Sequence, residues 1–195
     1  MKKLLFTAGL FILASYSTVF GQTVTFSYTG SLQSLTIPSC VTAVTITAYG
    51  AAGGKSSGND EGLGAKIIGT FAVGSGDVLD VMVGQKGISG NDGSGGGGSF
   101  VWNTAGNVLM VAAAGGGGGY GGMLGGNGSA TTTPIAGGGP QGSAPGGSGG
   151  NGGSGGTCSS IYAGAGGGAG WLSNGGTGSS CGSYGGGGGG NTPLS

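Results

Sequence analysis

The chain has 195 residues, 58 of them glycine, and five basic residues balance five acidic ones, so its formal net charge is zero. The basic residues are all lysines and histidine is absent, which excludes Ser-His-Asp and Cys-His catalysis and argues against zinc. Because binding to phosphates or anionic lipids needs clustered Lys or Arg, the composition also argues against a nucleic-acid partner and a membrane-surface protein.

The first residues are typical of a secretory signal peptide. Lys2 and Lys3 precede an apolar stretch, Leu4–Ala14, and the small residue Gly21 precedes Gln22 at the predicted cleavage site. The alternative is a membrane anchor, but the stretch is shorter than the roughly 20 residues of a spanning helix. We expect residues 1–21 to be removed, and residues 22–195 to be secreted or displayed at the cell surface, with no membrane span.

Residues 22–114 show the period-two alternation of half-buried strands. Alternating apolar residues predict strands within 24–28, 35–37, 44–48, 67–73, 79–83 and 100–102. The continuous apolar run 108–114 predicts a strand buried on both faces. With at least seven strands and no helical period, we expect a mainly β fold with enough strands for a sandwich.

Residues 115–195 form a second, polyglycine half of the same domain. One interpretation is a flexible tail. A second interpretation, a collagen-like helix, does not fit the sequence, because the period of three is confined to 146–157 and proline is scarce. We favour a third: glycine segments packed side by side as extended helices of three residues per turn, because this half is uncharged and large apolar residues such as Ile161 and Trp171 interrupt it.

Three cysteines, Cys40, Cys158 and Cys181, are present in a chain expected to meet an oxidising environment. We predict a disulfide between Cys158 and Cys181, since both lie in the polyglycine half. Cys40 would then be a free, buried thiol. The absence of any disulfide remains open.

No constellation of residues predicts catalysis, and we expect neither an enzyme nor a cofactor. Lys55, Lys66 and Lys86 have no matching motif for a Ser-Lys pair. Asp77 and Asp80 are three apart on an expected strand and so point to opposite faces, and Asp60 and Glu61 are expected to be solvated in a loop.

Two binding motifs are also incomplete. The residues Gly53-Gly54-Lys55-Ser56 are similar to the end of a phosphate-binding loop, but Tyr49 stands where the motif needs its first glycine and no helix can follow. Calcium candidates are confined to 59–61 and 91–92, which do not follow a known calcium-loop pattern. We therefore predict no metal site.

Aromatic side chains are the remaining candidates for a binding surface, with core packing as the alternative. They are Phe100, Trp102, Tyr120, Tyr162, Trp171 and Tyr184.

Several stretches together resemble a known family: GDVLDVMVGQKG (76–87), GGGGSFV (95–101), NVLMVAAAGGGGG (107–119), GGAGWLSNGG (167–176) and GGGGGGN (185–191). Their order is similar to that of the glycine-rich domain in the ligand-binding region of anaplastic lymphoma kinase and leukocyte tyrosine kinase, and of secreted bacterial glycine-rich proteins. The resemblance implies a β-sandwich of tumour-necrosis-factor (jelly-roll-like) type that carries packed polyglycine helices. The chain has no kinase motifs, so a receptor kinase activity does not carry over.

From these features we expect a non-catalytic interaction module, either an adhesin or a component of an extracellular matrix, that binds an extracellular protein or glycan. The alternative is a structural protein that self-associates into a surface coat or a filament.

Overall fold

The structure is a computed structural model, and it describes residues 21–56, 61–90, 93–118, 125–128, 151–157 and 164–180. These residues contain six strands and no helix. The strands are β1 (Gln33–Thr36), β2 (Ala43–Tyr49), β3 (Lys66–Ala72), β4 (Val78–Met82), β5 (Ser99–Asn103) and β6 (Val108–Ala113). Accordingly, no helix within the described ranges is long and apolar enough to cross a membrane.

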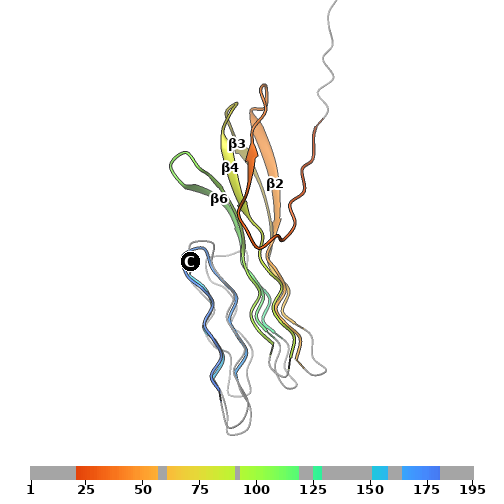
Figure 1. The fold of residues 1–195 in the computed structure, drawn as a ribbon, viewed down its shortest axis with the longest axis vertical. Coiled ribbons are helices and arrows are strands. Elements are labelled where there is room, and N and C mark those ends of the chain that lie inside the picture. Colours follow the sequence, from red (N-terminus) through yellow and green to blue (C-terminus); the bar gives the residue numbers. More distant parts are fainter. Residues whose placement is uncertain are drawn as a thin grey trace, which may run out of the picture.

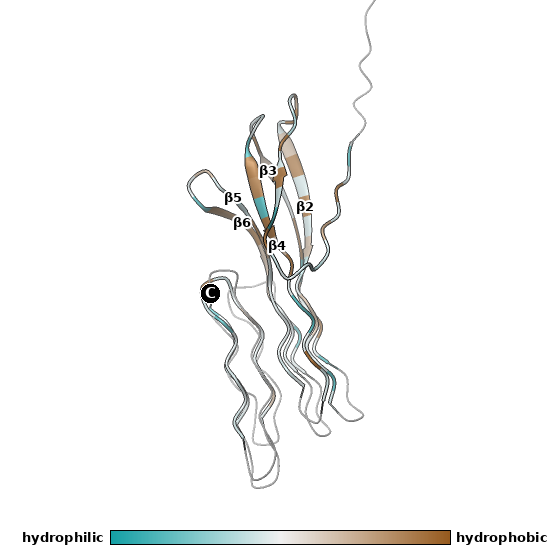
Figure 2. Cartoon of the chain, in the orientation of Figure 1, coloured by the Kyte–Doolittle hydropathy of each residue, from teal (hydrophilic) through white to brown (hydrophobic). Residues whose placement is uncertain are grey.

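The strands form two antiparallel sheets, which confirms a mainly β fold. One sheet has four strands in the order β1-β4-β5-β6, and the other consists of β2 and β3. Figure 1 shows the strands together in one part of the molecule, with extended segments running on from their ends. Figure 2 shows that the most hydrophobic residues lie mainly on the strands.

Among the described residues, two small clusters of buried side chains lie between the sheets. The first consists of Ile37, Leu79, Val81 and Val101, and the half-buried Val44 and Ile46 of β2 pack against it. In the second, Ala48 of β2 meets Val111 and Ala113 of β6. Each cluster therefore joins side chains from the two sheets, as the alternation along β2 predicts.

Two of the predicted strands differ from the structure. Residues 24–28 form no strand, because their backbone pairs with no other strand in the described part of the chain. Phe26 packs against the core, but the side chains of Val24 and Tyr28 remain 47% and 48% exposed. The described residues thus form six strands rather than at least seven.

The strand expected over 108–114 is present as β6, but it is not buried on both faces. Val108 and Leu109 are exposed, and only Val111 and Ala113 are buried. The reason is that β6 begins at the exposed turn after β5, and only its second half reaches Ala48 of β2, against which Val111 and Ala113 pack.

A glycine array and a charged cluster as the candidate functional site

Strands β2 to β6 each continue into, or follow, an extended segment rich in glycine. We call these segments, residues 50–54, 61–65, 84–88, 93–98 and 114–118, together with 125–128, the glycine array. They run side by side away from the sheets in Figure 1. The array therefore joins the two sheets, because the segments before β3 and after β6 are hydrogen-bonded to each other although these strands belong to different sheets.

Hydrogen bonds within the array recur at every third residue. Gly50 and Gly53 donate from their backbone nitrogens to the carbonyl oxygens of Ala65 and Gly62, at 2.8 and 2.9 Å. The same spacing recurs for Ala51 and Gly54, which donate to Gly97 and Ser94, and for Gly62 and Ala65, which donate to Gly117 and Ala114. These segments run antiparallel, since the acceptor number falls as the donor number rises.

Residues 151–157 and 164–179 form a second unit with the same spacing, which we call the outer glycine unit; its three extended segments are 151–157, 164–170 and 174–179. Gly153 and Gly156 donate to Gly168 and Ala165; Gly164 and Gly167 donate to Ser179 and Gly176; Gly176 and Ser179 donate back to Gly153 and Gly156. The three segments thus donate backbone hydrogen bonds to one another in a closed cycle. The backbone groups of each extended segment are therefore bonded to neighbouring segments rather than within the segment itself.

Glycine is required here because neighbouring backbones approach too closely for a Cβ atom. A Cβ built on Gly116 would lie closer than 3.0 Å to the backbone carbonyl of Gly62, and one built on Gly95 would collide in the same way with Gly167. No shift of a flexible side chain can relieve these contacts, because the obstructing atoms belong to the backbone.

The outer glycine unit is attached to the sheet by aromatic and backbone contacts. The ring of Trp171 lies 5.2 Å from those of Phe100 and Trp102, both of which are buried on β5. Gly118 donates to the carbonyl of Gly166, and Ala169 donates to that of Gly96, each at 3.2 Å. Phe100 and Trp102 are therefore buried, and the half-buried Trp171 packs against them, whereas Tyr120, Tyr162 and Tyr184 lie outside the described residues.

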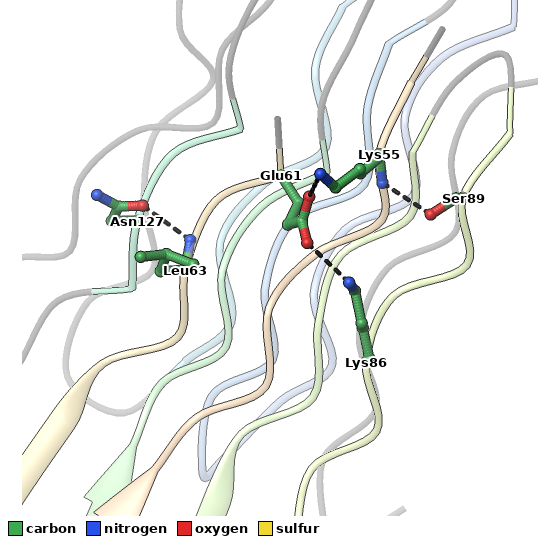
Figure 3. Close-up of polar contacts among 6 residues, drawn as sticks. All are labelled: Lys55, Glu61, Leu63, Lys86, Ser89 and Asn127. Atoms are coloured by element: carbon green, nitrogen blue, oxygen red, sulfur yellow. Dashed lines mark hydrogen bonds and ion pairs between the residues drawn. The ribbon is translucent and has the colours of Figure 1, made fainter. Parts of the chain in front are cut away.

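Glu61 is the centre of a charged cluster at the far end of the array (Figure 3). Its Oε1 accepts a hydrogen bond from Lys86 Nζ at 2.7 Å, and its Oε2 lies 3.4 Å from Lys55 Nζ. The hydrogen bond from Lys86 is the main reason why the pKa of Glu61 is lowered from 4.5 to about 2. The prediction that Glu61 is a solvated loop carboxylate is therefore wrong: it forms ion pairs with Lys55, which follows the segment 50–54, and with Lys86 of the segment 84–88.

The backbone N–H groups around Lys55 are also hydrogen-bonded to other parts of the chain. Gly53 and Gly54 donate their N–H groups to the carbonyls of Gly62 and Ser94, and the N–H of Lys55 donates to Ser89 Oγ at 3.0 Å. In a phosphate-binding loop these donors would point at the anion. Here they hold the array together, as does the bond from Leu63 N–H to Asn127 Oδ1 at 2.8 Å (Figure 3).

The other two carboxylates of the described residues, Asp77 and Asp80, have separate partners. Asp80 Oδ1 accepts from Ser34 Oγ at 2.6 Å, while Asp77 Oδ2 accepts from Gly74 N and Asn103 Nδ2. Within the described ranges, no three Asp, Glu, Cys or His side chains lie close enough to hold a metal. The calcium candidates 59–60 and 91–92 lie outside those ranges.

The cysteines give one correction. Cys40 is free but exposed, not buried, because it sits in the turn between β1 and β2 with a φ of 69°. Cys158 and Cys181, the predicted disulfide pair, lie outside the described residues. Gly21 and Gln22, at the predicted cleavage site, are both exposed. Residues 1–20 lie outside the described residues.

The outer face of β2 and β3 was not singled out from the sequence. Tyr49 and Ile68 are 59% and 60% exposed on it, and Lys66 Nζ lies 5.4 Å from the centre of the Tyr49 ring. Beside them, the hydroxyls of Thr45 and Thr70 share a hydrogen bond of 2.9 Å. The signal was present in the alternation itself, since the residues between the core-facing ones of β2 must point outward.

No protein-family model matches the chain, and no curated protein matches it significantly.

Proposed function

We propose that the chain is a secreted or cell-surface interaction module without catalytic activity, an adhesin or an extracellular-matrix component. The observation that carries this proposal is the exposed face of β2 and β3, where Tyr49 and Ile68 stand open to solvent on a hydrogen-bonded sheet. Aromatic and apolar side chains on a rigid frame are typical of binding surfaces, because little entropy is lost when they are covered.

We further propose that the two sheets form a β-sandwich of tumour-necrosis-factor type, on which the glycine segments pack as polyglycine helices. The support for the helices is the donation from every third residue, which equals the three residues per turn of the extended left-handed helix. The support for the sandwich is the core shared between β2 and β6. This is the architecture that the resemblance to the glycine-rich receptor domains implies; their kinase activity is not proposed.

A screen of the purified chain against arrays of glycans and extracellular proteins tests the proposed function. A hit should weaken at least about tenfold on Tyr49→Ala, as expected when an aromatic side chain at the centre of an interface is removed. Leu172→Ala is the matched control, because Leu172 is also exposed, at 56%, but lies in the outer glycine unit. Binding that survives Tyr49→Ala and is lost on Leu172→Ala would place the site elsewhere.

The second candidate is a structural protein that self-associates into a coat or filament. It is favoured by one observation: β2 and β3 pair only with each other, so both outer edges of their sheet are open in the described part of the chain. A filament would need both edges to pair with further copies.

A further inference from the structure

We propose that the outer edge of β2 is a self-association interface, where two copies of the chain pair antiparallel to form one continuous four-stranded sheet. This pairing needs only a second copy of the chain. It is independent of the protein or glycan that the module binds.

Two backbone bonds at the ends of the β2–β3 ladder determine which residues of β2 face β3. Val73 N donates to the Thr42 carbonyl and Gly50 N donates to the Ala65 carbonyl. Opposed residues in an antiparallel pair alternate between pairs that exchange backbone bonds and pairs that do not. Residues 44, 46 and 48 are in phase with 42 and 50 and bond to β3, so residues 43, 45, 47 and 49 direct their N–H and C=O groups to the open side.

In the described part of the chain, nothing is hydrogen-bonded to the backbone on that open side. The remaining polar contacts of β2 also go to β3: the hydroxyl of Thr45 bonds that of Thr70, and Lys66 lies over the ring of Tyr49. The edge is thus a row of backbone donors and acceptors that a further strand can satisfy.

The other three edge strands of the described sheets carry features that hinder pairing, and β2 does not. Strand β1 has only four residues. Strand β3 begins with Lys66 and has Gly69 at its centre. Strand β6 is bulged at Met110, since Val101 pairs with Val111 but Trp102 pairs with Leu109. Short length, charge and bulges are the devices that protect sheet edges, whereas β2 has seven residues in regular register with no charge and no proline.

The sequence of β2 also suits a twofold axis through Ile46. Outward-directed Thr45 would exchange backbone bonds with Thr47 of the second copy, and Ala43 with Tyr49 of the second copy. On the exposed face this places each tyrosine ring beside an alanine, where it has room, and threonine beside threonine, a favourable cross-strand pair. No like charges oppose each other, and the interface closes at two copies.

Sedimentation velocity on the purified chain between about 1 and 100 µM should show a monomer–dimer equilibrium. Thr45→Lys/Thr47→Lys places lysines opposite lysines across the axis and should raise the dimer dissociation constant at least about tenfold. Thr45→Lys/Thr47→Glu places opposite charges there and should restore it. The matched control is Ile68→Lys/Thr70→Lys, which adds the same charges to the facing positions of β3 and should leave the dimer intact.

Hydrogen exchange on the unmodified chain gives a second measurement that needs no variant. Amide protons of Thr45 and Thr47 should exchange more slowly as the concentration rises, while those of Ile68 and Thr70 should not. A chain that stays monomeric throughout, or a dimer in which the Thr45 and Thr47 amides exchange as in the monomer, overturns the interface. Larger polymers that depend equally on β3 also overturn the closed pair and support the filament instead.

Discussion

The ring of Trp171 lies 5.2 Å from that of Trp102, at an interplanar angle of 61°. Edge-to-face packing at this separation is favourable for aromatic rings. The contact joins the outer glycine unit to the buried side of the four-stranded sheet, because Trp102 and Phe100, whose ring also contacts Trp171, are 8% and 1% exposed. The outer glycine unit has few side chains, and the large side chain of Trp171 holds it to the sheet.

Replacing Trp171 with alanine should therefore lower the free energy of unfolding by about 2–4 kcal/mol, the range for removing a large side chain from a packed site. Denaturant unfolding measures this change, and near-ultraviolet circular dichroism should lose part of its aromatic signal. Leu172→Ala, at the exposed neighbouring position, should change stability by no more than about 0.5 kcal/mol. Equal effects of the two substitutions would contradict the docking role of Trp171.

In limited proteolysis, residues 22–195 should resist cleavage together, as a single cooperative domain. The backbone bonds from Gly118 to Gly166 and from Ala169 to Gly96 tie the outer glycine unit to the array. Protection against proteases follows such hydrogen bonding and burial. If residues 115–195 are trimmed rapidly by thermolysin while 22–114 survives, the polyglycine half is a loose tail after all.

The ion pair at Glu61 predicts a pH dependence in the acid range. The pKa of Glu61 is lowered from 4.5 to about 2, mainly by the hydrogen bond from Lys86. A lowered pKa in the folded state means that the carboxylate stabilises the fold above pH 4.5, and that this contribution is lost as the pH falls towards about 2. Lys86→Met should raise the pKa of Glu61 towards its ordinary value, as an NMR titration of the side-chain carboxyl can measure.

Lys66→Met is the control for that titration. Lys66 lies over the Tyr49 ring rather than beside the carboxylate, so its removal should leave the pKa of Glu61 unchanged. A similar rise in both variants would mean that general charge, not the bond from Lys86, lowers the pKa of Glu61.

Part of this fold is predictable because apolar side chains alternate with polar ones along the strands. The alternation of Val44, Ile46 and Ala48 predicts β2 and its buried face, and the structure confirms both. The same pattern at Val24, Phe26 and Tyr28 gives a wrong strand, since alternation shows which side chains can be buried but not whether the backbone has a partner.

The candidate site was much harder to predict. A run of identical glycines contains no information on register, so the bond from Gly118 to Gly166 has no signature in the sequence. Lys86 and Glu61 are 25 positions apart and meet only because the segments after β4 and before β3 lie in the same array. The close packing of neighbouring backbones in the array could be inferred only in general terms, because the segments are rich in glycine and poor in charge.

Single substitutions of glycine by alanine separate a packed array from a flexible spacer. In a spacer, Gly→Ala is neutral or stabilises by up to about 1 kcal/mol, because it reduces the freedom of the unfolded chain. In the array, Gly116 donates its N–H to the carbonyl of Ala51, and an added Cβ would collide with the carbonyl of Gly62. The two segments must then separate, which breaks backbone bonds in a buried setting. Gly116→Ala should therefore lower the free energy of unfolding by about 1–3 kcal/mol or more.

Gly74→Ala provides the matched control. Gly74 is exposed after β3, and the nearest atom to an added Cβ, Asp77 Oδ1, would be at an ordinary 3.5 Å. Alanine keeps the N–H that Gly74 donates to Asp77 Oδ2, and the backbone there is not left-handed. Thermal melts of the two variants and the unmodified chain should thus show a lower midpoint for Gly116→Ala alone. Since the two models predict opposite signs at Gly116, a midpoint that stays the same or rises there would show that the glycines are spacers.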